Sequence, residues 1–154
     1  MRQVTQCATI LSCLGVLIMF HNAAAGTVLG VHGGKLAACP STPNCVSSQA
    51  TDAEHSIAPL TYGTSLADAK ARLKRVVGEM PRTRLISETD DYLHFEFTTR
   101  IMRFVDDVEF YFDDAAKRIH VRSASRVGRS DFGVNRKRVE QIRAAFAAGD
   151  SGHR

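Results

Sequence analysis

Hydrophobic residues follow helical spacing in two separate parts of the chain. In the first part, from Thr64 or Ser65 to Pro81, apolar side chains recur every three or four positions, at Leu66, Ala69, Leu73, Val76, Val77 and Met80. This spacing predicts an amphipathic helix that ends at the proline. In the second part, Asn135 is predicted to be the N-cap of a helix. The buried stripe of that helix would comprise Val139, Ile142, Ala145 and Phe146.

Between these helices, apolar and polar residues alternate, which is typical of strands that bury one face. The residues predicted to point inward are Leu93, Phe95, Phe97, Phe104, Val108, Phe110, Phe112, Ile119 and Val121. Residues 83–88 are predicted to add a strand, and a short strand at residues 56–60 would be confined to an edge by Pro59. The predicted fold class is α+β, an antiparallel β-meander of four to five strands with two helices packed on one face.

The N-terminus has the three regions of a secretory signal peptide. Arg2 precedes an uncharged run over residues 8–20, and small residues precede a cleavage point after Ala25. The run of 13 residues is shorter than the roughly 20 that a membrane-spanning helix needs, so we expect membrane contact only transiently, through the signal peptide. The expected location is periplasmic or secreted. Residues 26–38 are expected to be a flexible lead, 39–148 one α+β domain and 149–154 a disordered tail.

Cleavage would remove Cys7 and Cys13 and leave Cys39 and Cys45. These two thiols lie six positions apart around two prolines, and an exported chain meets an oxidising compartment. A structural disulfide is therefore the leading interpretation. Closing so small a loop would contribute on the order of 2 kcal/mol. A redox-active pair and a zinc site are the alternatives, but the first favours a closer spacing and the second needs further ligands.

Positive charge is concentrated in residues 117–143, which hold nine Lys and Arg against two acidic residues. A basic patch usually indicates nucleic acid. Because an exported protein rarely meets nucleic acid, we expect none as a partner. An anionic small molecule, a lipid head group or an acidic protein fits the patch better. A solvated basic face without any ligand remains an alternative, and no cofactor is predicted.

The strands on either side of residues 113–116 are predicted to form a hairpin with those four residues as its loop. This register places Asp107 opposite Arg122 and Glu109 opposite His120, all on the solvent-exposed face. A metal site on this face would draw on the set His94, His120, Asp107 and Glu109. Alternating polar residues are also the ordinary pattern of a solvated sheet face, and no metal is predicted.

The same register turns Asp106 toward the apolar face, opposite Ser123. An inward carboxylate is costly unless it is paired or hydrogen-bonded, so Asp106 should have a partner. Its position suits either a structural ion pair or an acid with a perturbed pKa at the edge of a pocket. The candidate partners are Ser123, Ser125, Arg126 and a loop amide.

Residues 125–138 form the most distinctive stretch, a loop with two glycines that brings hydroxyls, amides and arginines to a helix N-terminus. Helix N-termini bind anions. Alternatively, Asp131 and Asp106 already neutralise the nearby cations. The candidate ligand-binding residues are Asp106, Arg122, Ser123, Ser125, Arg126, Ser130, Asp131, Asn135 and Arg138.

Three motifs occur in order along the chain: Cys-Pro-x-x-Pro-Asn-Cys-Val-Ser-Ser (39–48), Phe-x-Asp-Asp-Val-Glu-Phe (104–110) and Val-Arg-Ser-Ala-Ser-Arg-Val-Gly-x-Ser-Asp-x-Gly-Val-Asn (121–135). Together they resemble the family known as domain of unknown function number 1499, found in bacteria and in plastid-bearing organisms. The resemblance spans residues 39–146. It implies the domain, but no activity, cofactor or catalytic residue.

Three hypotheses for function follow. The first is a non-catalytic periplasmic binding or accessory module that holds an anionic ligand or an acidic partner with the region from Arg122 to Arg138. The second is a hydrolase or transferase that uses Asp106 with Arg126 and a loop serine. The third is a structural envelope protein. Because no recognisable catalytic motif is present, the sequence favours a protein that is not an enzyme.

Overall fold

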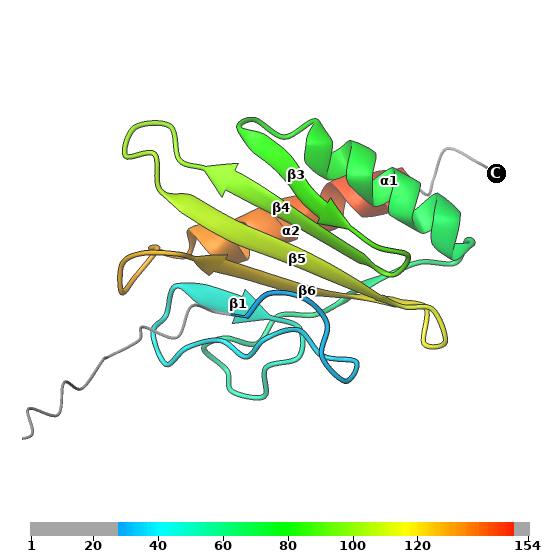
Figure 1. Cartoon of the computed structure of the whole chain (residues 1–154), viewed down its shortest axis with the longest axis horizontal. Helices are drawn as coiled ribbons and strands as arrows, with labels where there is room; N and C mark the ends of the chain where they lie inside the picture. The colour runs from blue at the N-terminus through cyan, green and yellow to red at the C-terminus, as the bar shows by residue number, and fades with distance from the viewer. Residues whose placement is uncertain (1–27, 150–154) are drawn as a thin grey trace, which may run out of the picture.

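The computed structural model describes residues 28–149, so the predicted signal peptide and residues 150–154 of the predicted tail lie outside the described residues. The elements are β1 (Cys45–Ser47), β2 (Leu60–Thr61), α1 (Leu66–Gly78), β3 (Thr83–Glu88), β4 (Tyr92–Thr98), β5 (Val105–Asp113), β6 (Arg118–Ser125) and α2 (Val134–Ala148). The strands form one antiparallel sheet in the order β1-β6-β5-β4-β3, and β2 also pairs with β6 (Figure 1). The predicted α+β class is confirmed, with six strands instead of four to five.

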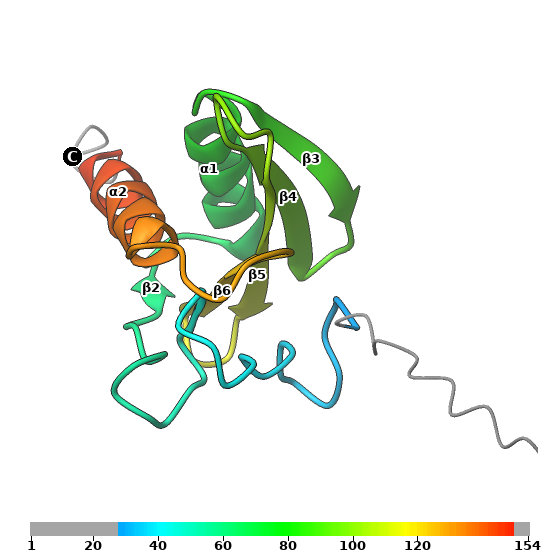
Figure 2. The same cartoon turned by 90° about the vertical axis from the view of Figure 1, so that its left-hand side faces the viewer.

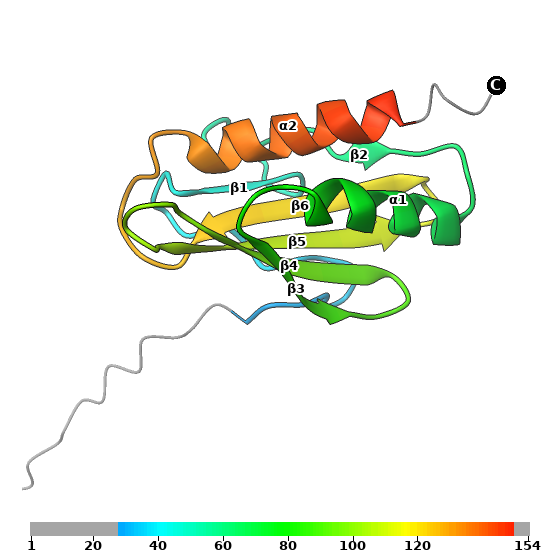
Figure 3. The same ribbon diagram turned by 90° about the horizontal axis from the view of Figure 1, so that it is seen from above.

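Both helices pack on one face of the sheet, which we call the inner face (Figures 2 and 3). The alternation predicted this face correctly in β4, β5 and β6, since the apolar residues of these strands are buried against α1 and α2. Phe104, which was also predicted to point inward, lies in the loop before β5 and is exposed, so that prediction is wrong. The centre of the core is formed by the fully buried side chains Leu73, Val77, Leu93, Val108, Phe110, Ile119, Val121, Val139 and Ile142. None of the helices in residues 28–149 is long and apolar enough to cross a bilayer.

Helix α1 begins as predicted, with the Ser65 side chain accepting a hydrogen bond from the backbone N–H of Asp68 at 3.1 Å. Helix α2 begins two residues earlier than predicted, and its N-cap is Gly133 with φ 78°. Asn135 therefore lies inside the first turn, where it is fully buried. The Asp131 carboxylate accepts hydrogen bonds from the backbone N–H groups of Gly133 and Asn135, so it satisfies the helix donors that an N-cap side chain would otherwise satisfy. Ala145, predicted in the buried stripe of α2, is exposed.

The β5–β6 hairpin has a different register from the predicted one. Glu109 lies opposite Arg122 and Asp106 lies opposite Ser125, so each β5 residue meets a partner two positions farther along β6. A shift of two residues keeps every side chain on its predicted face, because successive side chains alternate between the faces. The shift nevertheless changes which charged side chains are neighbours.

The turn of this hairpin explains the shift. The loop comprises residues 114–117 instead of 113–116. The Asp113 carboxylate accepts a hydrogen bond from the backbone N–H of Ala116 at 3.1 Å, and Lys117 adopts a left-handed conformation with φ 52°. This local geometry closes the hairpin one residue later than the spacing of apolar residues predicts.

The outer face of the sheet, opposite the helices, was predicted to be exposed to solvent, and this prediction is wrong. The segment that precedes Cys39 lies over this face (Figure 2). Gly30 donates its backbone N–H to Glu109 Oε1 at 2.7 Å, and Leu36 donates to Gln49 Oε1 at 2.8 Å. The sequence interpretation of residues 26–38 as a flexible lead did not anticipate these contacts. They bury a row of polar side chains, namely Tyr92, His94, Asp107, Glu109 and Arg122.

The two edges of the sheet differ. The outer edge of β6 is covered by β1 and β2, which pair with its two ends. At the opposite edge, the pairing of β3 with β4 is interrupted by a bulge between Leu85 and Ser87. The strand predicted at residues 56–60 is reduced to β2 and to a bridge at Ser56.

Candidate binding site on the outer sheet face

The structure divides the candidate ligand-binding residues between the two faces of the sheet. Asp106, Ser123, Asn135 and Arg138 meet on the inner face, under the first turn of α2. Arg138 donates from Nη2 to Asp106 Oδ2 at 2.5 Å, and from Nη1 to Asn135 Oδ1 at 2.6 Å and to Ser123 Oγ at 3.1 Å. The prediction that Asp106 has a partner is confirmed. The partner, Arg138, was not among the four candidates named for Asp106, but the alternative that Asp106 neutralises the cations near the helix N-terminus is confirmed for Arg138.

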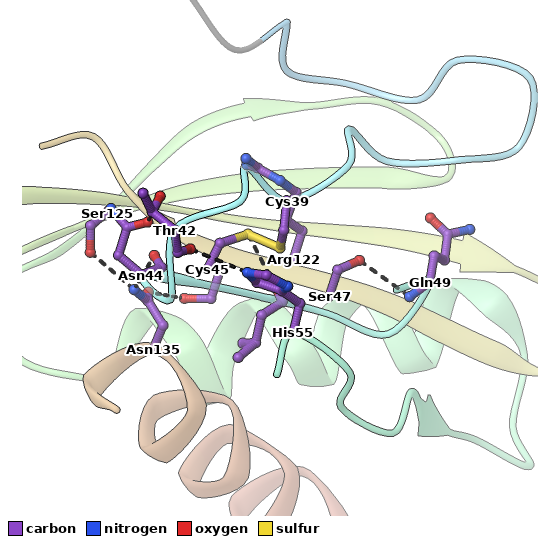
Figure 4. The surroundings of a disulfide bond; sticks show 12 residues. Cys39, Thr42, Asn44, Cys45, Ser47, Gln49, His55, Arg122, Ser125 and Asn135 are labelled. Atoms are coloured by element: carbon purple, nitrogen blue, oxygen red, sulfur yellow. Dashed lines mark hydrogen bonds between the residues drawn. A yellow bond between two sulfur atoms is a disulfide. The ribbon is translucent and has the colours of Figure 1, made fainter. Parts of the chain in front are cut away.

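Asn135 joins this network to the loop closed by the disulfide. Its Nδ2 donates to the Asn44 carbonyl and to Ser125 Oγ, each at 3.0 Å (Figure 4). Its Oδ1 also accepts from Ser123 Oγ at 2.6 Å. With the bond from Arg138, Asn135 makes four hydrogen bonds, which is the full capacity of an amide side chain. The inner network therefore has a structural role, because its central residue has no bond left for a ligand.

The predicted disulfide between Cys39 and Cys45 is present, with the two Cα atoms 5.6 Å apart. Asn44, inside the loop that the bridge closes, donates from Nδ2 to the Gly128 carbonyl at 2.8 Å, and its own carbonyl accepts from the backbone N–H of Ser125 at 3.0 Å. The disulfide loop thus holds the end of β6 and the segment that leads to α2. Figure 4 shows Arg122 beside the disulfide.

On the outer face, Glu109 is fully buried and accepts three hydrogen bonds. The donors are Arg122 Nη1 to Oε2 at 3.2 Å, Tyr92 Oη to Oε1 at 2.8 Å and the backbone N–H of Gly30 to Oε1 at 2.7 Å. Burial and the neighbouring Glu109 carboxylate raise the pKa of the Tyr92 hydroxyl, so it stays protonated and donates. This cluster anchors the N-terminal segment on the sheet.

A second outer-face cluster surrounds Asp107. Arg126 donates from Nε to Oδ2 at 2.8 Å and from Nη2 to Oδ1 at 2.7 Å, and Nη2 also lies 2.5 Å from Glu96 Oε1. Burial raises the pKa of Asp107, but the hydrogen bonds from Arg126 and His94 outweigh it and hold the pKa at about 2. Since an ionised carboxylate only accepts, His94 Nε2, which lies 2.7 Å from Asp107 Oδ1, carries the proton.

This arrangement separates the two residues on which the enzyme hypothesis rested. Asp106 pairs with Arg138 on the inner face, whereas Arg126 pairs with Asp107 on the outer face. The proposed Asp106 and Arg126 pair is therefore not formed. Within residues 28–149, no group of three or more His, Cys, Asp and Glu side chains is arranged to hold a metal ion.

A cleft of about 350 Å³ lies on the outer face between the two clusters. It is lined by Leu29, Pro40, Asp107, Arg122, Ala124, Ser125 and Arg126. The Arg122 side chain is only 2% exposed, and its Nε is buried without a hydrogen-bond partner in the described part of the chain. The Arg126 side chain is 43% exposed. Three of the candidate ligand-binding residues, Arg122, Ser125 and Arg126, thus line the same cavity.

Several of the other predicted basic and loop residues have structural partners instead. Arg136 donates to the backbone carbonyls of Ser56 and Glu54, and Arg143 donates to those of Pro59 and Ala58. These bonds hold the segment before β2 against α2. In the loop before α2, Ser130 Oγ accepts a hydrogen bond from the backbone N–H of Phe132 at 3.3 Å. A large part of the basic region therefore maintains the fold.

The burial of His94, Tyr92 and Glu109 on the outer face was not predicted from the sequence. Their alternation with apolar residues looks the same whether a face meets water or another segment of the chain. The glycines at 30, 33 and 34 were the available signal, because all three have positive φ. The backbone of Gly30 bonds to Glu109, and a Cβ added at Gly34 would lie 3.8 Å from the Tyr111 hydroxyl.

Taken together, these features define a small α+β protein whose antiparallel sheet has two helices on one face and a disulfide-closed loop at one edge. An N-terminal segment lies over a polar cleft on its other face. The chain belongs to the family described as "Protein of unknown function (DUF1499)", whose model matches residues 35–146. The resemblance seen in the three sequence motifs is thereby confirmed. A comparison with curated proteins finds no match.

Proposed function

We propose that this protein is a non-catalytic binding module that holds a small anionic ligand in the outer-face cleft. The observation that carries the proposal is the state of Arg122, whose buried Nε has no partner within residues 28–149. A buried donor without a partner costs about 1–3 kcal/mol. An oxygen atom of a bound ligand that reaches Nε would remove this cost, and Arg122 is one of the residues that line the cleft.

Two guanidinium N–H groups of the cleft have no partner among the described residues, whereas its charged acceptors are engaged. The carboxylates of Asp107 and Glu109 are each bonded to an arginine. Arg126 uses Nε and Nη2 for Asp107 and Glu96, so its Nη1 has no bond to the described residues. Two arginines with free N–H groups recognise a carboxylate or a phosphate better than they recognise a cation or a neutral group.

The same engagement of the carboxylates argues against acid–base chemistry in the cleft. Asp107 has a pKa of about 2 and remains an anion bound to Arg126, so it cannot deliver a proton near neutral pH. The cleft therefore suits recognition. We further propose that the protein works outside the cytoplasm, because the Cys39–Cys45 disulfide persists in oxidising compartments.

The proposal is tested by exporting the full chain from an expression host and comparing its native and denatured masses. We expect an excess mass that disappears on denaturation, or saturable binding of inorganic phosphate in calorimetry. Replacing Arg126 with Gln should weaken phosphate binding about tenfold, because one charge-assisted hydrogen bond is lost. Arg118→Gln is the matched control, since it removes the same charge from an exposed residue at the far end of β6.

Two results would overturn this function. One is a protein without excess mass that binds no phosphate at millimolar concentration. The other is an equal loss of phosphate binding in Arg126→Gln and Arg118→Gln, which would show attraction by net charge alone. Urea unfolding of both variants separates lost binding from lost folding.

A further inference from the structure

Two loops leave the sheet at the same end, which we call the loop end. Residues 99–104 connect β4 to β5, and residues 126–133 connect β6 to α2. The pairing of Asp106 with Ser125 brings the two loops together, and the backbone N–H of Arg126 donates to the Val105 carbonyl at 3.1 Å. Figures 1 and 3 show both loops projecting from this end of the molecule.

The loop end carries most of the exposed large hydrophobic side chains. Six of the nine such side chains in the described residues lie here: Ile101, Met102, Phe104, Val127, Phe132 and Val134. Phe132 is 97% exposed and Ile101 is 85% exposed. Single exposed apolar residues need no explanation, but a concentration of them at one end indicates a surface that contacts something apolar.

The backbone holds Phe132 in this exposed position at a cost. Its φ is 53°, in the left-handed region that bulky residues avoid. The flanking contacts fix it there, because Ser130 accepts from the N–H of Phe132 and Asp131 accepts from the N–H groups of Gly133 and Asn135. Strain of this kind is typical of functional positions. At 97% exposure, little contact within the chain compensates for it.

The charges around these apolar side chains have one sign. Arg100, Arg103 and Arg129 are exposed and form no ion pair with any residue in 28–149. Residues 99–104 contain no acidic side chain, and the one acid of residues 126–133, Asp131, is bonded to the start of α2. Apolar side chains flanked by unpaired arginines match a surface that is negatively charged outside and apolar beneath.

We propose that the loop end docks on an anionic lipid bilayer, with Phe132 and Ile101 entering the boundary of the acyl chains and the arginines contacting lipid phosphates. Ile101 and Phe132 lie within two separate loops and line none of the clefts described above, which favours a deformable bilayer over a protein surface. This inference goes beyond the proposed ligand cleft and does not depend on it, because neither Phe132 nor Ile101 lines that cleft.

The chain contains no tryptophan, so a single introduced indole reports on its own surroundings. Phe132→Trp is mixed with vesicles that contain phosphatidylglycerol and with vesicles of pure phosphatidylcholine. We expect a blue shift of the emission with the anionic vesicles alone, reduced by added salt. Ile86→Trp is the matched control, because Ile86 is an exposed apolar residue of β3, outside the loop end, and its emission should not shift.

Sedimentation with the same vesicles tests the energetics. Phe132→Ser should lower the association constant for the anionic vesicles about tenfold, as expected from withdrawing one aromatic side chain from an apolar medium. Ile86→Ser should leave this constant unchanged. The double variant Arg100→Gln/Arg103→Gln should weaken binding to the anionic vesicles. All variants share one N-terminus, so any contribution of that segment to vesicle binding cancels.

Three outcomes would overturn the proposal that the loop end docks on a bilayer. Equal binding to anionic and zwitterionic vesicles would remove the role of charge. Binding that is insensitive to Phe132→Ser would remove the role of the apolar tip. A stable complex with an acidic protein, lost in Phe132→Ser and accompanied by no vesicle binding, would assign the loop end to a protein partner. Phosphate binding in the cleft would be unaffected by each of these results.

Discussion

Replacing Asp106 with Asn tests the structural role of the inner network. The Arg138 side chain is 9% exposed, and its Nη2 lies 2.5 Å from Asp106 Oδ2. The substitution keeps the shape of the side chain but leaves the buried guanidinium without a counter-charge. Removing one partner of a buried ion pair costs about 3–5 kcal/mol. We expect a value near the lower limit, about 3 kcal/mol, because Arg138 keeps its hydrogen bonds to Asn135 and Ser123 and its stacking on Phe97 at 4.7 Å.

Urea unfolding followed by circular dichroism measures this free energy, and a lower midpoint with an unchanged slope is the expected result. The corresponding drop in Tm is roughly 10 °C. The double variant Asp106→Asn/Arg138→Met removes both charges, so its loss should be smaller than the sum of the two single losses by about 1–3 kcal/mol. A change below about 0.5 kcal/mol for Asp106→Asn would refute the reasoning and return Asp106 to the list of functional candidates.

Three further predictions concern other parts of the fold. Replacing Cys39 and Cys45 with Ser should lower the free energy of unfolding by about 2 kcal/mol, and denaturation with and without a reductant measures it; equal midpoints would contradict a closed disulfide. The pKa of Asp107 is held at about 2 against an ordinary 3.8, so the ionised carboxylate stabilises the folded protein by about 2 kcal/mol. This stabilisation is complete above pH 3.8 and is lost as the pH falls through 2. The free energy of unfolding, measured against pH, should show this loss, and Asp107→Asn should flatten the dependence. Phe132→Gly should leave the free energy of unfolding unchanged or raise it by up to about 1 kcal/mol, because relief of the left-handed strain exceeds the added entropy of the unfolded chain. A clear loss of stability in urea unfolding would show that Phe132 packs on the protein.

The inner face was predictable because its physical cause is local. Leu93, Phe95 and Phe97 recur with a period of two, and such a pattern fixes which side chains turn inward whatever the exact register. The same alternation placed Asp106 on the inner face. Because a buried carboxylate is costly without a partner, its need for one could also be predicted. The class of the fold and the buried side of the sheet could therefore be read from the chain.

The predictions that failed depend on contacts between segments that are distant in the sequence. The partner of Asp106 lies 32 residues away on α2. Which residue of α2 becomes that partner depends on how the helix is rotated about its axis when it packs on the sheet. Glu109 is buried by Gly30, which lies 79 residues away. A two-residue change in the hairpin register was enough to replace His120 with Arg122 as the neighbour of Glu109. None of these relations leaves a periodic signal.

The bulge in β3 has a consequence for how copies of this protein meet. A sheet edge with a regular row of free N–H and C=O groups is a template for aggregation with another chain. Here β1 and β2 cover one edge, and at the other edge the bulge between Leu85 and Ser87 breaks the regular spacing. Arg84 and Glu88 add charge to the same strand. A protein with these edges can be crowded on a surface at high local concentration, and its sheets will still not merge into a continuous fibril.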